Sequence, residues 1–577
     1  MSEQSSSPRA SRRSVGLSPI DRVKRYHQET KHEFMRYARS LGFLDWANQP
    51  DPFRRYIGTP LHRLPLLPEE QGEEPKYDDL YVPGRIQPRP VTIHSLSRFL
   101  EYALSITAWK QAGEVRWALR SNPSSGNLHP TEGYVLVRSV KGLASDPALY
   151  HYAPKEHGLE RRALIPNSVG EDLFRLLPEE SFLFGLSSIY WREAWKYGER
   201  AFRYCHHDVG HALGSARLAA AALGWRLVIL SGLTSEQVNA VLGVERAEDY
   251  SDSEREHGDC LAVVWPDRAP RDGYRVPTTL PGDAIMKFGA CAWQGKANRL
   301  SVDEPLTWDI IDDVAEVVVQ THPASGSVIV RSRPPLREEV PVRSVSAHQV
   351  IHQRRSAVAF DGRSSISVEL FYRMLWRVMP VGPESYVDRS PPWDLGFFEP
   401  RVHLILFVHL VDGLTPGLYC LVRDAEKVPL LKGTMTPTFT WEVPSRCPAS
   451  LPFYRLAEGD ARRVAAQVSC HQDIAGASAF SLGMLAEFDG PLQQEGPGLY
   501  PRLFWECGVI GQVLYLEAEA ADVRATGIGC FFDDPVHEVV GLQDARFQSL
   551  YHFTVGGAVD DARLTTLPPY PDEAHTS

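Results

Sequence analysis

Hydrophobic positions along the chain predict two long buried helices, one in each half. Residues 207–225 (HDVGHALGSARLAAAALGW) and 506–523 (ECGVIGQVLYLEAEAADV) are rich in Ala, Leu, Val and Gly over several helical turns, as in a core helix. Two short apolar runs, YVLV at 134–137 and HLIL at 403–406, predict buried strands. Each half therefore alternates helices and strands, and the predicted fold class is α+β.

An internal repeat relates the two halves. When the chain is shifted by 298 residues, Gly210 meets Gly508 and Gly243 meets Gly541 without a gap. A shift of 269 residues places the run YVLV on HLIL. Chance matching of common residues is the alternative, but two long registers in the same order favour a duplication. The predicted organisation is a disordered tail at 1–19, a helical arm and linker at 20–90, and two domains at 91–320 and 345–570.

Length and charge limit the class of protein. A chain of 577 residues exceeds what one core usually supports, and its net charge of −11 argues against a nucleic-acid-binding surface. No run of about 18 apolar residues is present to cross a membrane, and the polar start lacks the apolar core of a secretory signal. The eight cysteines form no CxxC pair, which suits free thiols in a reducing compartment. We expect a cytoplasmic protein without nucleic-acid or membrane partners.

The sharpest local motif is the segment RSNPSSGNLHPTE at 120–132, which runs directly into the predicted strand at 134–137. Its Pro and Gly residues predict a tight loop. The loop offers two hydroxyls, a carboxamide and several backbone N–H groups, which can satisfy the donors and acceptors of a heteroaromatic ring. Taken alone, such a loop is more often a plain turn.

A family resemblance gives these motifs a function. The run RSNPSSGNLHPTEGYVLV, followed by ALYHYAPKEHGLERR, closely resembles the SagB/ThcOx-type dehydrogenases, a branch of the flavin-dependent nitroreductases. In the second half, HQRRSAVAF at 352–360 is similar to the superfamily signature RRSxRxF, with Val358 in place of its second arginine. GLTPGLYCLVRD and ATGIGCFFDDPVHEVVGL match a later strand and helix of the family. The resemblance implies two nitroreductase-like three-layer α/β/α domains that form an intramolecular pseudo-dimer.

The resemblance also implies FMN, bound between the halves by residues from both. Guanidinium groups and a hydroxyl suit its phosphate, and glycines permit close backbone approach. The candidate cofactor residues are Arg354, Arg355 and Ser356 near the phosphate or ribityl chain, Pro123, Ser124, Ser125 and Asn127 against the ring, and Gly527 and Gly529 nearby.

The two halves have complementary gaps in this motif set. The 269-residue shift places the PSSGN loop on residues 392–396 (PWDLG), without the serines and the asparagine. The 298-residue shift places Gly527 and Gly529 on Ile229 and Ser231, and the first half has no good RRS counterpart. We therefore expect one composite FMN site per chain and an empty pseudo-symmetric twin.

Candidate catalytic groups are Lys196 and Tyr197, which match a Lys-Tyr motif that azoline-oxidising relatives use. Either could take a substrate proton if burial or neighbours shift its pKa. The alternative is a helix face on which the lysine is solvated and the tyrosine packs. His207 and His211 have the spacing of metal ligands, but without a HExxH glutamate they are predicted to be buried core histidines, and no metal is expected.

Three functions remain open from sequence. The first is a dehydrogenase that oxidises an azoline-like or peptide-derived substrate by hydride transfer to flavin, with cyclase or other peptide-modifying partner proteins and oxygen as the final acceptor. The second is an NAD(P)H-dependent reductase of nitro or quinone compounds. The third is a non-catalytic flavin-binding scaffold. Because one chain supplies both halves of the site, a monomer suffices, and further association stays open.

Overall fold

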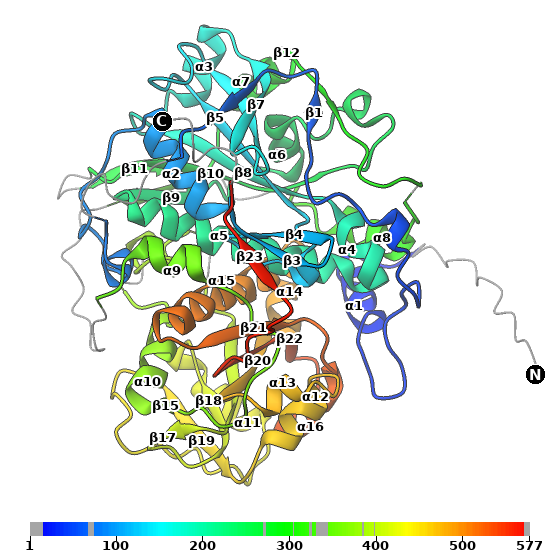
Figure 1. Ribbon diagram of the computed structural model, residues 1–577, viewed down its shortest axis with the longest axis vertical. Coiled ribbons are helices and arrows are strands. Elements are labelled where there is room, and N and C mark those ends of the chain that lie inside the picture. The colour runs from blue at the N-terminus through cyan, green and yellow to red at the C-terminus, as the bar shows by residue number, and fades with distance from the viewer. Residues whose placement is uncertain are drawn as a thin grey trace, which may run out of the picture.

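The computed structural model describes residues 16–66, 74–268, 273–303, 305–321, 326–330, 344–382, 386–396 and 399–570. The first part of the chain forms one lobe and the second part another, and they meet along two long helices (Figure 1). The predicted tail up to residue 15 lies outside the described residues, as does most of the predicted boundary between the halves.

The first lobe is built on an antiparallel sheet with the strand order β12-β7-β6-β5-β8-β10-β9, and β2 also pairs with β7. The strands are β2 (Leu61–Arg63), β5 (Thr131–Val137), β6 (Ala148–Ala153), β7 (Gly158–Leu164), β8 (Phe182–Ser188), β9 (Trp225–Ile229), β10 (His257–Pro266) and β12 (Ala292–Trp293). The predicted strand at 134–137 lies within β5, whose residues are all buried.

The second lobe has an antiparallel sheet with the order β19-β18-β16-β20-β22-β21. Its strands are β16 (Val402–Val408), β18 (Gly417–Leu421), β19 (Phe453–Glu458), β20 (Phe480–Glu487), β21 (Arg524–Ile528) and β22 (Phe547–Gly556). When the six strands of each sheet are numbered in the order in which they occur along the chain, this sheet has the same strand order as β7-β6-β5-β8-β10-β9 of the first lobe.

Strand registers test the two sequence shifts. Gly185 of β8 and Gly483 of β20, which are 298 residues apart, lie opposite Leu261 and His552. The next residues, Ala262 and Phe553, lie opposite Ile229 and Gly527, so the 298-residue shift also holds for β9 and β21.

The 269-residue shift holds for β6 and β18 but is wrong for β5 and β16. Tyr134 faces Gly185 in the first sheet, whereas Ile405 faces Gly483 in the second, so β16 is displaced by two further residues. A two-residue displacement keeps every side chain on its face of the sheet, so hydrophobic pattern alone cannot detect it.

Helices cover both faces of each sheet. The helices are α1 (Pro19–Glu29), α2 (Ile93–Ala103), α3 (Asn167–Phe174), α4 (Tyr190–Tyr197), α5 (Ala201–Ala222), α6 (Ser235–Leu242), α7 (Gly282–Gly289), α8 (Asp309–Val317), α9 (Ala347–Gln353), α10 (Val368–Arg377), α11 (Val428–Thr434), α12 (Arg462–Val468), α13 (Asp473–Gly476), α14 (Asp489–Glu495), α15 (Leu499–Ala520) and α16 (Asp533–Val540). One core cluster runs through α5, α15 and the inner faces of both sheets, and separate clusters lie under the outer helices of each lobe.

The chain ends tie the lobes together. β23 (Thr565–Leu567), red in Figure 1, returns from the second lobe and pairs with β3 (Ile106–Ala112), which pairs with β4 (Val115–Arg120). The predicted helical arm is largely wrong. α1 begins where the Ser18 side chain accepts a hydrogen bond from Asp21 N, but the following residues contain turns and the short strands β1 (Tyr56–Ile57) and β2. β2 pairs with β7 at the edge of the sheet, so strand pairing, and not the charged and aromatic composition of the arm, decides the structure of this segment.

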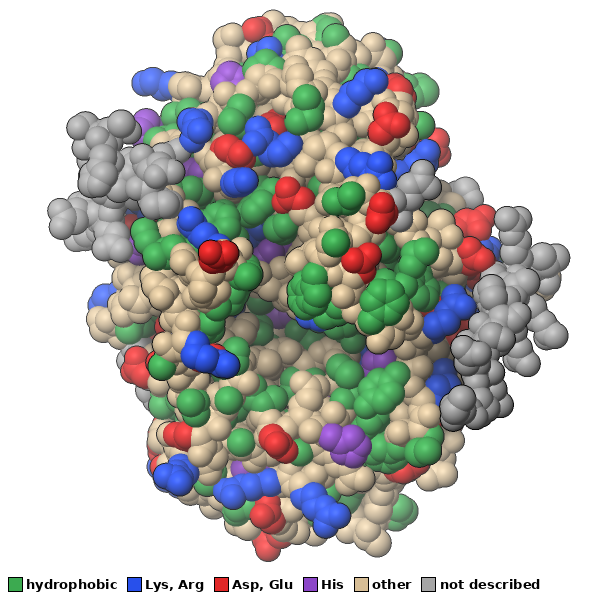
Figure 2. Space-filling model, turned by 45° about the vertical axis from the view of Figure 1, so that its right-hand side comes forward, with side chains coloured by type: hydrophobic (Ala, Val, Ile, Leu, Met, Phe, Trp, Pro, Cys, Tyr) green, Lys and Arg blue, Asp and Glu red, His purple; other side chains and the backbone are tan. Residues whose placement is uncertain are grey.

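The remaining strands form small two-stranded pairs: β1 with β13 (Lys296–Ala297), β11 (Tyr274–Pro277) with β14 (Ser327–Val330), and β15 (Ile366–Ser367) with β17 (Val411–Asp412). In the described part of the chain, no helix has the length and apolar character needed to cross a membrane. Acidic and basic side chains are interspersed over the face drawn in Figure 2.

Candidate functional site

A cavity of about 750 Å³ lies between the lobes, and both halves line it. The first lobe contributes β3, β4 and the loop before β5, and the second contributes the segment after α9 and the end of β21. All nine predicted cofactor residues line this one cavity: Pro123, Ser124, Ser125, Asn127, Arg354, Arg355, Ser356, Gly527 and Gly529.

Asp208 of α5 accepts hydrogen bonds from the loop before β5. Ser125 donates from its backbone N to Asp208 Oδ1 at 3.0 Å and from its Oγ to the same oxygen at 3.0 Å. Burial raises the pKa of Asp208 to about 7, although hydrogen bonds from Ser124 and Ser125 oppose the shift. Sequence reasoning missed Asp208, whose only signal was that it is the single carboxylate of a buried helix.

Asn127 is oriented by the protein itself. It has a left-handed backbone (φ 60°), and its Nδ2 donates to Ala118 O at 2.9 Å. Its Oδ1 lies 3.1 Å from Nε2 of His129, whose pKa burial holds well below the usual value. The neutral imidazole must donate here, because the amide oxygen can only accept. One N–H of Asn127 remains for a ligand.

Cationic side chains gather at the opposite wall of the cavity. Arg354 Nη2 donates to Arg120 O at 2.7 Å, and Arg355 Nη1 donates to His352 O at 2.7 Å. Among the described residues, neither Arg354 nor Arg355 forms an ion pair with a carboxylate within 4.0 Å, and buried Arg354 Nε has no hydrogen-bond partner. Burial, with the charge of Arg354, lowers the pKa of Arg355 to about 10.

Lys110 of β3 adds to this positive charge. Burial lowers the pKa of its ammonium group, and the charges of Arg355 and Arg524 lower it further. Arg354, Arg355 and Lys110 all line the cavity, where the charge of Arg354 lowers the pKa of Arg355 and the charge of Arg355 lowers that of Lys110. An anion placed there would relieve this repulsion, and a phosphate suits guanidinium groups in particular.

Tyr515 of α15 links the basic segment to β21. Ser356 Oγ donates to the Tyr515 hydroxyl at 3.1 Å, and the Gly527 N–H donates to the same oxygen at 2.8 Å. The guanidinium of Arg354 lies over the tyrosine ring at 5.2 Å from its centroid. Sequence reasoning missed Tyr515, since nothing in its helical pattern marks it apart from other buried aromatics.

Gly527 and Gly529 are required by neighbouring side chains. A Cβ on Gly527 would overlap the hydroxyl of Tyr551, and a Cβ on Gly529 would overlap the ring of Tyr204. Both tyrosines line the same cavity. The glycines therefore admit these rings to the cavity wall, a reason that differs from the backbone approach to a ligand suggested by the sequence.

Lys196 and Tyr197 end α4 beside the loop before β5. A Cβ on Gly126 would lie 2.5 Å from the Tyr197 hydroxyl and 3.1 Å from Lys196 Nζ, so both polar heads reach the loop. Tyr197 lines the cavity, and burial, followed by the charge of Glu193, raises the pKa of its hydroxyl well above 10. This tyrosine therefore holds its proton at neutral pH.

The helical histidines have separate partners. His207 Nε2 lies 3.0 Å from Leu550 O, and His211 Nε2 lies 3.2 Å from the Tyr551 hydroxyl. Burial lowers the pKa of His211 to about 3, so it is a neutral core side chain.

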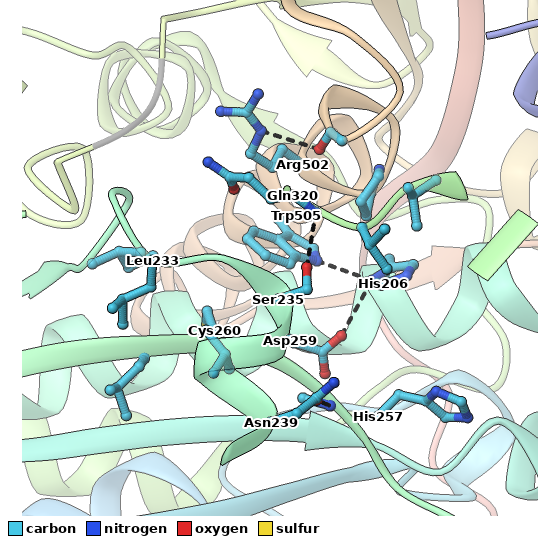
Figure 3. Close-up of a pocket in the computed structure, with 18 of the residues that line it drawn as sticks. His206, Leu233, Ser235, Asn239, His257, Asp259, Cys260, Gln320, Arg502 and Trp505 are labelled. Atoms are coloured by element: carbon cyan, nitrogen blue, oxygen red, sulfur yellow. Dashed lines mark hydrogen bonds and ion pairs between the residues drawn. The ribbon is translucent and has the colours of Figure 1, made fainter. Parts of the chain in front are cut away.

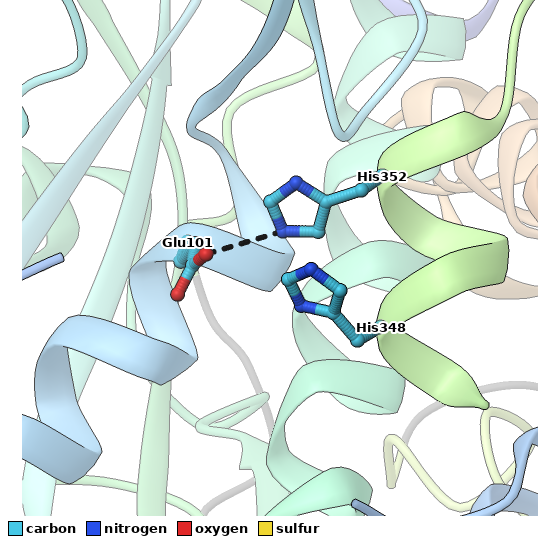
Figure 4. A group of neighbouring side chains, drawn as sticks. All are labelled: Glu101, His348 and His352. Atoms are coloured by element: carbon cyan, nitrogen blue, oxygen red, sulfur yellow. Dashed lines mark ion pairs between the residues drawn. The ribbon is translucent and has the colours of Figure 1, made fainter. Parts of the chain in front are cut away.

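Within the described residues, one group has the composition of a metal site: Glu101 of α2 with His348 and His352 of α9 (Figure 4). The Arg98 guanidinium lies 3.4 Å from Glu101 and donates to His348 Nδ1 at 3.3 Å. His352 lies 3.2 Å from the same carboxylate. Glu101 is thus already balanced by a cation, and these contacts explain the group as an ion-pair network between α2 and α9.

A second pocket has a volume of about 120 Å³ (Figure 3). Ile229–Ser231, which the 298-residue shift places on Gly527–Gly529, line it, together with Val318–Gln320 after α8. Trp505 and His206 also line it, and Trp505 Nε1 donates to His206 Nδ1 at 3.0 Å. This pocket is far smaller than the 750 Å³ cavity between the lobes.

Comparison with known proteins identifies the first lobe. Residues 87–251 match the Nitroreductase family model. The chain contains a nitroreductase-family domain. This domain is similar to the Methanocaldococcus jannaschii protein named "Putative nitroreductase MJ1384", with 27% identity over 183 residues that make up 30% of this chain and 87% of that protein.

The nitroreductase-family domain is part of a larger shared fold. A crystal structure described as a "putative nitroreductase" from Anabaena variabilis superposes with a TM-score of 0.60 at 20% identity, covering 93% of this chain and 99% of that one. Another, from Ralstonia eutropha, has a TM-score of 0.27 at 17% identity and covers 39% of this chain and 89% of that one. The chain therefore shares its two-lobe architecture with the Anabaena protein.

Proposed function

We propose that the chain is an FMN-dependent oxidoreductase that binds one FMN in the 750 Å³ cavity between its lobes. The observation that carries this proposal is the pair of buried Arg354 and half-buried Arg355, which lacks a carboxylate partner within 4.0 Å among the described residues. A flavin phosphate would supply the missing charge. The loop from Pro123 to Asn127, with its hydroxyls and free amide N–H, lies on the other side of the same cavity, where the ring would bind.

We further propose that the second lobe is also a nitroreductase-like domain, so that the chain is an intramolecular pseudo-dimer with domains at 91–320 and 345–570. The matching strand orders of the two sheets support this proposal. The contact between Gly210 and Gly508, which the 298-residue shift relates, supports it further. No homodimer is then needed to complete the site.

One site per chain follows from the difference between the two pockets. The larger cavity has both the loop before β5 and the basic segment after α9. The smaller pocket, at about 120 Å³, has neither, and Val318–Gln320 fill part of it. A flavin requires several hundred Å³, so the smaller pocket cannot hold one.

Bound flavin would supply the redox chemistry, as the acceptor or donor of a hydride. The chain's own groups would position the substrate and handle its proton. Tyr197 keeps its proton at neutral pH and can donate a hydrogen bond into the cavity. Lys196 lies beside it, with Nζ 5.2 Å from the tyrosine ring centroid. A protonated Tyr197 can orient the substrate as a hydrogen-bond donor, which leaves Lys196 to take the proton of the carbon whose hydride leaves for the cofactor.

For the substrate, we propose the SagB/ThcOx-type reaction, in which an azoline-like or peptide-derived heterocycle is oxidised. The resemblance of the segment at 120–137 and the position of Lys196 and Tyr197 against Gly126 support this choice. Such a substrate would be made by a cyclase or other peptide-modifying partner. An NAD(P)H-dependent reductase of nitro or quinone compounds and a non-catalytic flavin-binding scaffold are the competing outcomes of the test.

The test is a visible absorption spectrum of the purified chain, with the released flavin quantified per chain. Arg355→Ala and Asn127→Ala are measured beside Arg363→Ala, an exposed arginine outside the cavity. We expect about one FMN per chain in the parent and in Arg363→Ala, and little in the other two. Two flavins per chain would contradict the single site. No flavin after reconstitution would overturn the oxidoreductase and leave a binding or scaffold role without this cofactor.

Reduction of the bound flavin, seen as loss of its visible absorbance, then distinguishes the three candidate functions. Reduction by an azoline-containing peptide, with reoxidation by oxygen, supports the dehydrogenase. Rapid bleaching by NAD(P)H, followed by turnover of a nitro compound or quinone, supports the reductase. Bound flavin that no donor reduces supports the scaffold.

A further inference from the structure

Cys470 and Cys530 lie with their sulfur atoms 2.9 Å apart, although 60 residues of chain separate them. Both are free, partly exposed cysteines. Phe532 N donates to Val468 O at 2.8 Å, and Gln472 Nε2 donates to Cys530 O at 2.9 Å. The two segments are therefore held together by bonds that do not involve sulfur, and the thiols are placed for reaction with each other.

The backbone at Cys470 is unusual. Cys470 and His471 both have left-handed conformations, with φ of 54° and 57°. Residues with a Cβ seldom adopt this conformation, because the side chain crowds the neighbouring carbonyl. The turn after α12 thus adopts an unfavourable geometry at the residue that meets Cys530.

The surroundings of Cys530 stabilise its thiolate. The hydrogen bond from Cys470 lowers the pKa of the Cys530 thiol, while burial opposes the shift and a hydrogen bond from His32 adds to it. His32 Nδ1 accepts from Ala38 N at 2.9 Å, so Nε2 carries the proton and faces the sulfur as a donor. The Arg200 guanidinium, which donates to Gly529 O at 3.2 Å, adds positive charge. These are the surroundings of a nucleophilic cysteine.

Access to this pair is from the large cavity. Cys530 and Gln472 line the cavity, whereas Cys470 is not among the residues that do. A reagent in the cavity therefore meets Cys530, whose sulfur lies 2.9 Å from that of Cys470. This is the arrangement of an attacking and a resolving cysteine.

We propose that Cys530 and Cys470 form a redox-active pair that reduces a low-molecular-weight disulfide entering the cavity. The Cys530 thiolate attacks one sulfur of the disulfide RSSR, whose S–S bond breaks, and one RS⁻ leaves and is protonated. Cys470 then attacks the sulfur of Cys530, displaces the second RS⁻ and forms the Cys470–Cys530 disulfide. RSSR is reduced to two RSH, the two cysteines are oxidised, and their two protons pass to the products. The reaction does not require the flavin.

The test uses the full chain, reduced and desalted, with oxidised glutathione as the disulfide. After acid quenching and alkylation, intact mass and peptide mapping count the remaining thiols among the eight cysteines. We expect two thiols to be lost and a peptide linking Cys470 to Cys530. Cys470→Ser should keep a stable glutathione adduct on Cys530, because the resolving thiol is absent. Cys447→Ser, at a partly exposed cysteine outside the cavity, should behave like the parent.

Eight alkylated thiols after treatment, or a link between other cysteines, would overturn the proposal. So would a Cys470→Ser variant that forms no adduct while its circular dichroism matches the parent. Flavin content is measured on the same samples. A chain that binds no flavin but forms the Cys470–Cys530 disulfide contradicts the proposed function alone, and a flavin-loaded chain with unreactive thiols contradicts this inference alone.

Discussion

Gly210 of α5 and Gly508 of α15 lie against each other where the two long helices cross. A Cβ on Gly508 would lie 2.7 Å from Gly210 Cα, and a Cβ on Gly210 would lie 2.8 Å from Gly508 Cα, with backbone carbonyls closer still. Neither clash can be relieved by turning a side chain, because the opposing atoms are backbone. Because the helices cross this closely, the segment after α9 in one lobe and the loop before β5 in the other can line the same cavity.

Gly508→Ala should therefore destabilise the chain, although alanine is the better helix former. Forcing helices apart at a packed crossing typically costs about 1–3 kcal/mol. The measurement is the urea midpoint, with Gly433→Ala in α11 as the control, because nothing lies within 4 Å of a Cβ there. Gly433→Ala should leave the urea midpoint unchanged or raise it slightly. Equal midpoints for both variants would contradict the close contact.

Asp208 should make stability depend on pH. Burial raises the pKa of its carboxyl to about 7, whereas an unfolded aspartate titrates near about 4. Its contribution is fully present below the unfolded pKa and is lost as pH rises from about 4 to about 7, because the unfolded chain releases the proton first. Relative to the parent, Asp208→Asn should therefore gain stability over that range. Urea midpoints at several pH values measure the difference, and the exposed Asp544→Asn serves as the control.

A difference between parent and Asp208→Asn that stays constant from pH 5 to pH 8 would contradict the raised pKa. Asp208 lies on α5 and holds Ser125 in the loop that lines the cavity. The same titration should therefore change flavin affinity near neutral pH in the parent and leave it flat in the variant.

Much of the candidate site could be predicted from the sequence, because its parts are short segments with distinctive residues. The loop of Pro123–Asn127 and the basic run at Arg354–Ser356 were each visible in the sequence, and the family resemblance implied that they belong to one site. Asp208 and Tyr515 could not be found this way. Each acts through a contact with a segment tens to hundreds of residues distant, and periodicity reports which face is buried but not what lies opposite.

The same limit applies to Cys470 and Cys530, which have no CxxC spacing and meet only through the turn before α13. In the fold, the long helices and central strands followed from apolar pattern. The arm between Thr30 and Arg54 did not, because its aromatic and charged residues serve tertiary contacts. Arg54, for example, is fully buried against Glu256.

Tyr515→Phe should weaken cofactor binding without unfolding the chain. Its hydroxyl accepts from both Ser356 Oγ and Gly527 N, so its loss leaves two donors unpaired and frees the basic segment from β21. Loss of one such bridge is worth about 1–2 kcal/mol, or roughly a tenfold rise in the FMN Kd. Fluorescence titration of the flavin-free chain gives the Kd. Tyr372→Phe, in α10 and outside the cavity, should bind FMN like the parent.

Tyr197→Phe should reduce turnover and keep the flavin. Loss of a hydrogen-bond donor at the reacting centre lowers rates by about 10²-fold or more. The measurement is the rate of flavin bleaching by an azoline-containing peptide, with flavin content determined beside it. Tyr190→Phe is the control, because Tyr190 lies in the smaller pocket. Unchanged bleaching in Tyr197→Phe would contradict a role for this hydroxyl in the reaction.

Asp533 of α16 anchors the arm and α5 through one buried carboxylate. It forms ion pairs with Arg200 at 3.0 Å and Arg203 at 2.7 Å, and it accepts from His32 N at 3.0 Å. Burial alone would raise its pKa, but the charges of Arg200 and Arg203 outweigh burial and hold the pKa far below the usual range. Removing the carboxylate leaves two buried guanidinium groups without their partner. Asp533→Asn should therefore cost about 3–5 kcal/mol of unfolding free energy.

The neighbouring Asp534 provides a matched comparison. Its side chain is 41% exposed, whereas the side chain of its partner Lys31 is 6% exposed, so Asp534→Asn should cost less than Asp533→Asn. The Asp533 contribution is present above the unfolded pKa of about 4 and declines as pH falls below it, so the loss in Asp533→Asn should be full at about pH 7 and smaller at about pH 3. Urea unfolding of both variants at pH 7 compares their losses, and unfolding of Asp533→Asn at pH 3 tests the decline. Equal losses in Asp533→Asn and Asp534→Asn would show that the buried network does not hold the arm to the second lobe.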